Sequence, residues 1–500
     1  MLYFVLSFLP IITLLICLLV IKLSAKRASL AAFLVAAAEF ILWIKPGTAG
    51  MVITLEKGLA MSLFVGLIAF SAMLLYNLVD ISGGFNVINR YLSGVFSDRF
   101  VMFLTISWVF SAFLQGIAGY GLPAVISTTI LIKAGFPAGK AAAASLLGHS
   151  WAISFGSMGS SIYAIDLVTD TPLHQILVSM AGYGSICMIC CGIGISFIYG
   201  GYRNILSGLR YVLPAGAVMS LSLMIMARFE MVSVIGFVTG LFGTAAMMMT
   251  YKITARARTG KFPERKALFS SIFPYILVIL FSLGFFLADP GVKLTFSFPG
   301  YETMTGQMVE PEKDYVVFNI FKYPFTIILL TTAICVICYL RTGRLKSRDI
   351  KTIGKVTYKK IISTEVTLVF LLCTASIMMD GGMTEILSTT IVRWTGSGYS
   401  FMAALIGTLG TFITGTNTNS NILFGSLQET AALSLSLSPA LMCAVQSIAA
   451  SVGGTIGPTN TALVAAVAGK SGKETEIYSY TIPVTLAVTL LLGAVNAVFI

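Results

Sequence analysis

Long apolar runs constrain this chain more than any other feature of its sequence. Roughly 20 apolar residues form a helix that crosses about 30 Å of hydrocarbon, and about twelve such runs follow one another here. Of the 500 residues, 57% are hydrophobic and only 10% are charged, whereas a soluble protein needs a charged surface. The first run, residues 2–23, lacks a basic start and a small-residue cleavage site, so we expect a retained helix and not a signal peptide. The sequence therefore predicts an all-α polytopic membrane protein.

Charged residues gather in a few loops and predict how the chain crosses the membrane. Residues 252–266 and 341–360 are strongly basic, whereas 289–318 holds five acidic residues against two lysines. Because positive loops stay in the cytoplasm, we expect the basic segments inside, the acidic segment outside, and both termini outside the plasma membrane. The net charge of +12 then reflects topology and not a nucleic-acid partner. The expected spans lie near 2–23, 28–44, 58–79, 138–168, 174–199, 205–228, 231–250, 269–288, 319–340, 363–379, 438–468 and 476–499.

Two further apolar segments, 100–134 and 399–434, do not fit as simple spans. Each is too long for one helix and is interrupted near its middle by small and polar residues. A single crossing by either segment would invert every later loop against the charge pattern. We therefore expect two re-entrant hairpins.

The two hairpins belong to an internal repeat. Residues 76–126 and 375–425 share an aspartate followed by glycines, then an amphipathic stretch, an apolar arm and a polar break. Further breaks, HSWAISFGSMGSS at 149–161 and AASVGGTIGPTN at 449–460, keep the same offset of about 300 residues. An odd number of expected spans separates the copies, so their orientations are opposite. Inverted repeats of this kind are typical of secondary transporters.

The repeat divides the chain into four expected parts. Asp80 and Asp380 occupy matching positions, where we expect them to anchor helix ends, and 83–96 is expected to be an interfacial helix. The parts are N-terminal helices at 1–57; a first inverted repeat at 58–199 with hairpin 100–134 and broken helix 138–168; connecting helices with basic cytoplasmic loops at 200–362; and a second inverted repeat at 363–500 with hairpin 399–434 and broken helix 438–468.

The four breaks are the candidate substrate site. Non-helical backbone at membrane depth is tolerated only where protein or a watery cavity surrounds it. Each break also exposes helix N-termini, whose free N–H groups and partial positive charge suit an anion. We expect these ends to hold a small carboxylate without a buried arginine. The candidate substrate-binding residues are Gln115, Gly116, Gly119, Gly121, Ser154, Gly156, Ser157, Thr414, Gly415, Thr416, Asn417, Thr418, Asn419, Ser420, Asn421, Gly457, Pro458, Thr459 and Asn460.

Three stretches at these breaks resemble the lactate permease family. They are FLQGIAGYGLPAVISTTILIKAGFPAGKAAAASLLGHSWAISFGSMG (113–159), ITGTNTNSNILFGSLQ (413–428) and GGTIGPTNTALVAAVAG (453–469). The resemblance recurs in order across roughly residues 60–500. It implies a secondary active transporter of L-lactate, and also of glycolate and D-lactate, usually coupled to protons. It also implies an elevator-type scaffold and transport domain and a homodimer, as in the larger ion transporter superfamily.

Two departures from the family pattern concern the coupling ion. Gln115 stands where the family has an acidic residue, and Asn417 stands where many members have aspartate. An amide does not titrate, so proton symport would need another group, and the candidates are His149 and Glu429. A helix-capping or packing role for His149 is the alternative. Sodium is the alternative coupling ion, since carbonyl and hydroxyl oxygens at unwound helices ligate Na⁺. We expect no metal centre and no cofactor.

Other classes of protein fit the sequence less well. An enzyme would need a nucleophile–base pair or a metal cluster, and the two distant histidines occur without an HExxH or GxSxG motif. A channel would show a continuous polar pore, whereas polarity is confined here to four breaks. A non-transporting membrane sensor remains an alternative because the family's carboxylates are missing.

Overall fold

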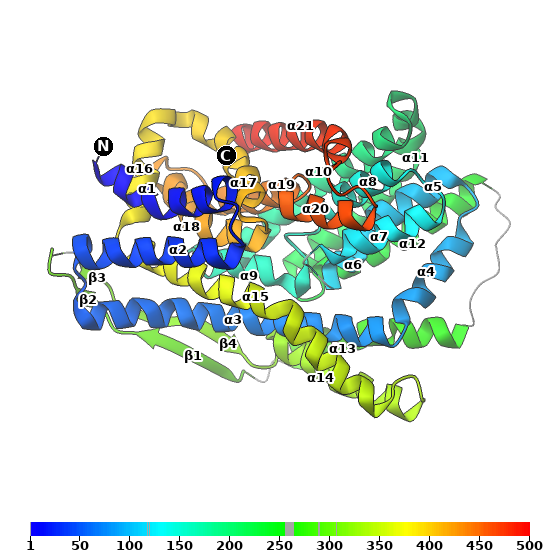
Figure 1. Cartoon of the computed structure of the whole chain (residues 1–500), viewed down its shortest axis with the longest axis horizontal. Helices are drawn as coiled ribbons and strands as arrows, with labels where there is room; N and C mark the ends of the chain where they lie inside the picture. Colours follow the sequence, from blue (N-terminus) through cyan, green and yellow to red (C-terminus); the bar gives the residue numbers. More distant parts are fainter. Residues whose placement is uncertain (1, 118, 120, 256–264, 289–290, 307) are drawn as a thin grey trace.

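The computed structural model describes residues 2–500 except 118, 120, 256–264, 289–290 and 307. It is a bundle of helices with a small β-structure at one edge (Figure 1). The first helices are α1 Leu2–Leu15, α2 Ala25–Glu39, α3 Gly47–Ile81, α4 Gly84–Val95, α5 Arg99–Leu104, α6 Ser111–Ile117, α7 Leu122–Lys133, α8 Ala138–Ser150, α9 Ser160–Asp166 and α10 Leu173–Gly200. The others are α11 Tyr202–Arg228, α12 Ile235–Ala255, α13 Arg265–Ala288, α14 Pro324–Arg341, α15 Ser347–Asp380, α16 Met383–Thr395, α17 Tyr399–Thr414, α18 Asn417–Ser434, α19 Pro439–Gly453, α20 Pro458–Val467 and α21 Thr475–Phe499.

Among the described residues, eleven helical segments are long and apolar enough to cross a membrane. This number is close to the twelve expected spans, but some of the segments are not the expected ones. Arg99–Ile117 and Met383–Thr414 qualify, although the first was expected to be a hairpin arm and the second an interfacial stretch followed by one. The expected span 138–168 does not qualify, because the chain leaves the helix between α8 and α9. The composition of these helices is that of a multi-pass membrane protein.

The expectation of an all-α chain is wrong for the acidic segment. Here β1 (Lys293–Phe298) pairs antiparallel with β4 (Glu312–Asn319), and β2 (Tyr301–Glu302) pairs with β3 (Met308–Val309). The β1 sequence KLTFSF alternates polar and apolar residues, which is the period of a strand with one covered face. Only the acidic charge of this segment entered the topology prediction, so the strand pattern was not recognised.

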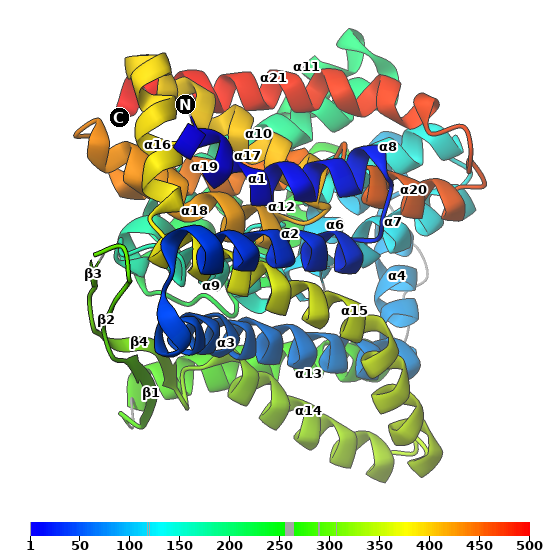
Figure 2. The ribbon, with the colours of Figure 1, turned by 60° about the vertical axis from the view of Figure 1, so that its left-hand side comes forward.

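The two longest helices, α3 and α15, pack against each other and run in opposite directions. The beginning of α3 meets the end of α15, where Thr54 and Lys57 bond to Asp380. The end of α3 meets the first half of α15, where Asn77 bonds to Thr357 and Lys360. Figures 1 and 2 show the two helices side by side along most of their length.

The order of elements repeats after each long helix. A glycine with positive φ, Gly83 (75°) or Gly382 (67°), turns the chain into a short helix, α4 or α16. A helix–turn–helix pair and a broken helix follow in both copies. The repeat read from the sequence is therefore also a repeat of secondary structure, and its two leading helices are antiparallel.

Two expected part boundaries, 57/58 and 362/363, fall inside continuous helices. Residues 347–360, expected as a basic loop, form the first half of α15. The span expected to begin at residue 58 continues through Lys57, which lies inside α3. The helix tolerates this lysine because its charge is paired with Asp380 at 3.0 Å and with Glu312 at 3.2 Å. The other basic segment, 252–266, lies largely outside the described residues.

Candidate functional site

The segment TGTNTNSN breaks the helix less than its composition suggests. Helix α17 ends at Gly415, which has φ +81°, and α18 begins at Asn417. Only Gly415 and Thr416 lie between the helices, and the Thr416 side chain accepts a hydrogen bond from the N–H of Asn419 at 3.2 Å. The expected break at 413–421 is thus a tight turn, and its asparagines form the first turns of α18.

The matching turn of the first copy lies between α6 and α7. Gly121, with φ +74°, precedes the first residue of α7, while residues 118 and 120 of this turn lie outside the described part of the chain. The broken helices open at similar places, between Ser150 and Ser160 in the first copy and between Gly453 and Pro458 in the second. All four expected breaks are therefore real interruptions between helices.

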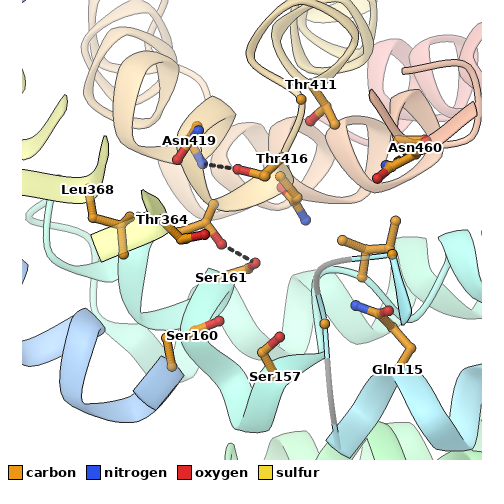
Figure 3. Close-up of a pocket in the computed structure, with 18 of the residues that line it drawn as sticks. Gln115, Ser157, Ser160, Ser161, Thr364, Leu368, Thr411, Thr416, Asn419 and Asn460 are labelled. Carbon is orange, nitrogen blue, oxygen red and sulfur yellow. Dashed lines mark hydrogen bonds between the residues drawn. The ribbon is translucent and has the colours of Figure 1, made fainter. Parts of the chain in front are cut away.

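A cavity lies among these interruptions (Figure 3). Thr411, Thr416, Asn419 and Asn460 approach it from the second copy, opposite residues of the first copy. Its volume is about 60 Å³, and one water needs about 10–15 Å³, so the cavity holds roughly four to six water-sized groups, which is the size of a small ligand. It is lined by Val65, Ala69, Gln115, Gly119, Gly121, His149, Ile153, Ser157, Ser160, Ser161, Thr364, Leu368, Thr411, Gly415, Thr416, Asn417, Thr418, Asn419, Gly454 and Asn460.

Hydrogen bonds tie the two copies together at the cavity wall. Asn417 Nδ2 donates to Ser154 Oγ at 2.8 Å and to Ser451 Oγ at 3.0 Å. Ser161 Oγ and Thr418 Oγ1 lie 2.8 Å apart. Two of these bonds, Asn417–Ser154 and Ser161–Thr418, join residues more than 250 positions apart in the two copies. The third, Asn417–Ser451, joins α18 to α19. The cavity wall therefore forms only when both copies are packed.

The cavity lining mixes apolar side chains with uncharged polar groups and a histidine, and carries no carboxylate, lysine or arginine among the described residues. Several buried lining atoms also have no hydrogen-bond partner among the described residues, including Gln115 Oε1, Thr411 Oγ1 and Asn417 Oδ1. Buried polar groups are normally paired. These atoms are therefore free to bond a ligand or water in the cavity.

Many of the predicted site residues line this cavity, and others support it. Those that line it are Gln115, Gly119, Gly121, His149, Ser157, Gly415, Thr416, Asn417, Thr418, Asn419 and Asn460. Those outside the lining are Gly116, Ser154, Gly156, Thr414, Ser420, Asn421, Gly457, Pro458, Thr459 and Glu429.

Several of the residues outside the lining hold neighbouring helices together. Gly116 lies against the backbone of α12, where an added Cβ would come 2.1 Å from Phe237 N. Asn421 donates to Ser161 O and Ser447 Oγ, both at 2.9 Å. Ser420 accepts from Gln446 at 3.1 Å. These residues hold the helices that carry the lining side chains.

The two expected proton-coupling residues have different surroundings. His149 lines the cavity, and its Nδ1 lies 2.8 Å from the Ser145 carbonyl oxygen. A carbonyl only accepts, so Nδ1 carries the hydrogen and Nε2 is the acceptor of the neutral ring. Glu429 lies elsewhere and accepts hydrogen bonds from the backbone N–H groups of Asp170 and Thr171. Its carboxylate caps the loop that follows α9.

We expect Glu429→Gln to lower stability without changing the ion dependence of transport. The amide is uncharged and puts an NH2 donor in place of one carboxylate oxygen, so the bonds from Asp170 and Thr171 to a charged group become ordinary ones, at a cost of about 1 kcal/mol each. Thermal unfolding of the purified protein and uptake at several pH values measure the two effects. Loss of pH-dependent uptake in a variant of unchanged stability would contradict this assignment.

The sequence pattern missed the part of the lining that comes from unbroken helices. Val65 and Ala69 belong to α3, and Thr364 and Leu368 to α15. Each pair has the i, i+4 spacing of one helix face, but nothing in the sequence says what that face meets. Ser160 and Ser161 lie at the start of α9 and are the last two residues of the expected break at 149–161.

Comparisons with known proteins agree with this geometry. Residues 3–500 match the family described as L-lactate permease. The L-lactate permease of Streptococcus iniae is 27% identical over 463 residues, covering 88% of this chain and 93% of its own. That of Bacillus subtilis is 26% identical over 473 residues, covering 85% and 83%.

One solved structure shares the fold. The YdaH transporter of Alcanivorax borkumensis superposes with a TM-score of 0.50 at 12% identity, covering 92% of this chain and 90% of its own. The family match extends over nearly the whole chain, and its relatives align from end to end. This chain therefore belongs to the L-lactate permease family.

Proposed function

We propose that this protein is a secondary active transporter of L-lactate and related 2-hydroxymonocarboxylates, including glycolate and D-lactate. The cavity between the two copies is the proposed substrate site. One observation carries the proposal: in a chain of the L-lactate permease family, three helices begin at this cavity, and its polar lining carries no carboxylate, lysine or arginine among the described residues. Relatives named L-lactate permease supply the substrate class.

Helix N-termini favour the carboxylate in this site. Helices α7, α18 and α20 begin at the cavity, with Gly121, Thr416 and Asn460 among the lining residues at these ends. Free N–H groups and the partial positive charge of helix N-termini favour an anion without a buried cation. A monocarboxylate needs no more than this, whereas a dicarboxylate would add a second charge.

Unpaired acceptors favour a substrate with a hydroxyl group. Gln115 Oε1 and Asn417 Oδ1 are buried acceptors without a partner among the described residues. The 2-hydroxyl of lactate or glycolate is a donor next to the carboxylate, so one compact ligand satisfies both kinds of group. Discrimination against analogues that lack the hydroxyl follows, because they leave these acceptors unpaired.

Proton symport is the proposed coupling, and sodium symport in the same fold is the alternative. The helical pairs α6–α7 and α17–α18 are proposed to be re-entrant hairpins, and the protein to work as an elevator with scaffold and transport domains. A homodimer in the plasma membrane, with both termini outside, completes the proposal. The family's use of these features supports it, and the antiparallel α3 and α15 fit inverted copies.

Labelled L-lactate uptake into proteoliposomes tests the function. We expect accumulation under an inward proton gradient, saturation with substrate, and counterflow, which separates a carrier from a channel or a sensor. Accumulation under a sodium gradient alone would replace the proton by sodium. No uptake under either gradient by folded protein would reject lactate as substrate.

A further inference from the structure

A buried carboxyl group lies beside the cavity without belonging to its lining. Glu365 follows Thr364 in α15, and both Thr364 and Leu368 line the cavity (Figure 3). Residues one position apart on a helix point about 100° apart. The Glu365 side chain therefore leaves α15 at the edge of the cavity-facing surface.

Helix α3 provides a recess for this carboxyl group. Its Gly66 faces Glu365 so closely that an added Cβ would come 2.2 Å from Glu365 Oε2. The neighbours of Gly66 at the same level, Val65 and Ala69, line the cavity. The carboxyl group thus lies between the middle of α3 and α15, at the wall that these two helices give to the cavity.

The Glu365 carboxyl group lacks the partners that a structural carboxylate has. Its Oε1 is buried and has no hydrogen-bond partner among the described residues. Glu429 shows the contrast, with backbone and side-chain donors around its carboxylate. An ionisable residue inside a membrane helix is costly to keep, and such residues mark ion and proton pathways.

Among the described residues, Glu365 forms no ion pair, and the nearest lysine on its own helix, Lys360, is directed elsewhere. Tyr323, before α14, interacts electrostatically with Glu365 and with Tyr163 of α9. On α3, Lys57 and Tyr76 lie about 14–15 Å along the helix from Gly66. Lys359 and Lys360 precede Glu365 on α15 by about 8–9 Å along the helix, and the Lys360 ammonium donates to Asn77 Oδ1 at 3.0 Å. The other charged groups on the described elements packed on α15 lie toward helix ends: Glu56 and Asp80 of α3, Lys26, Arg27 and Glu39 of α2, Glu385 and Arg393 of α16, and Glu429 of α18.

We propose that Glu365 is the group that binds the coupling proton. This inference rests on the proposed function and names the residue that performs its coupling. A deprotonated Glu365 repels a carboxylate in the adjacent cavity, since two like charges in a poorly solvated site interact strongly. A proton from the outer solution removes that repulsion, so the proton and the lactate anion each favour the binding of the other. Both leave together to the inner solution, and no net charge crosses.

The test measures protons and lactate on the same purified full-length protein. Labelled L-lactate is added in weakly buffered solution with a pH indicator, and bound lactate and protons taken up are counted. We expect about one proton per lactate in the wild type and none in Glu365→Gln, which still binds lactate saturably. In proteoliposomes, the Gln variant is expected to keep counterflow and to lose at least tenfold of the accumulation driven by a proton gradient.

Glu39→Gln is the matched control. Glu39 also has a buried carboxyl group without a partner among the described residues. It lies near the C-terminal end of α15, away from the cavity wall, since its neighbour Phe40 packs against Gly381. We expect this variant to take up protons and accumulate lactate as the wild type does.

Separate outcomes count against the inference and against the proposed function. A wild type that does not bind lactate, or binds it without proton uptake, rejects the proposed proton symport. A coupled wild type together with unchanged coupling in Glu365→Gln rejects Glu365 alone, and loss of proton uptake in His149→Gln would then assign the role to the imidazole. If Glu365→Gln fails to bind lactate, Glu365→Asp must restore both binding and proton uptake, and failure to do so overturns the inference.

Discussion

Replacing Asn417 by alanine is expected to reduce L-lactate uptake at least tenfold. Asn417 Nδ2 joins Ser154 of the first copy to Ser451 of the second, at 2.8 and 3.0 Å. Loss of two buried hydrogen bonds costs about 1 kcal/mol each, and the variant also loses the unpaired Oδ1 proposed to accept from the substrate. Initial rates of labelled lactate uptake in proteoliposomes, at matched protein content, give the measurement.

A second variant on the same helix provides the control for Asn417. Ser434 is exposed near the end of α18 and donates only to the Thr430 carbonyl. Ser434→Ala is therefore expected to transport at the wild-type rate. Wild-type uptake by a correctly inserted Asn417→Ala variant would remove this residue from the substrate site.

Replacing Lys57 by methionine is expected to produce the largest loss of stability. The Lys57 side chain is only 1% exposed and lies 3.0 Å from Asp380, which is 7% exposed. Removing the lysine takes a buried counter-charge away from Asp380, and breaking a buried ion pair in this way typically costs about 3–5 kcal/mol. Asp380 also accepts from Thr54 at 2.6 Å and from Tyr301 at 3.2 Å. The variant thus loosens the joint between α3, α15 and the β-structure.

Thermal unfolding in detergent measures this effect, and a double variant tests its cause. Lys57→Met with Asp380→Asn removes both charges, and we expect it to be more stable than Lys57→Met alone. Lys351→Met changes an exposed lysine of α15 and is expected to unfold at the wild-type temperature. A single Lys57→Met variant as stable as the wild type would show that the pair contributes nothing.

Much of the site was predictable because its chemistry is written into short local patterns. Glycines with positive φ stand where the sequence placed its breaks, at Gly121 and Gly415. Polar residues next to these glycines in otherwise apolar helices have no lipid-compatible role other than packing together or lining a cavity. The residues Gln115, Asn417 and Asn460 were found in this way, and all three line the cavity.

Other residues were not predictable, because their roles depend on which helices meet. In the sequence, Glu365 follows a basic stretch, and nothing nearby marks it as part of a site. Only its contact with Gly66 of α3 places it beside the cavity. Glu429 is a candidate coupling acid from the sequence, and only the fold brings the loop at Asp170 and Thr171 onto its carboxylate. In both cases the deciding neighbour lies more than 250 residues away in the sequence.

The sequence by itself determined that this chain is a membrane protein of repeated helices, because apolar length and glycine position act locally along the chain. It also determined the four interruptions and the uncharged character of the site. Only the tertiary structure decided that the acidic segment forms β-strands that reach Lys57 through Glu312, and that α3 and α15 supply a wall of the cavity. Such contacts arise from packing between distant segments, and a linear pattern does not specify which apolar helix faces will meet.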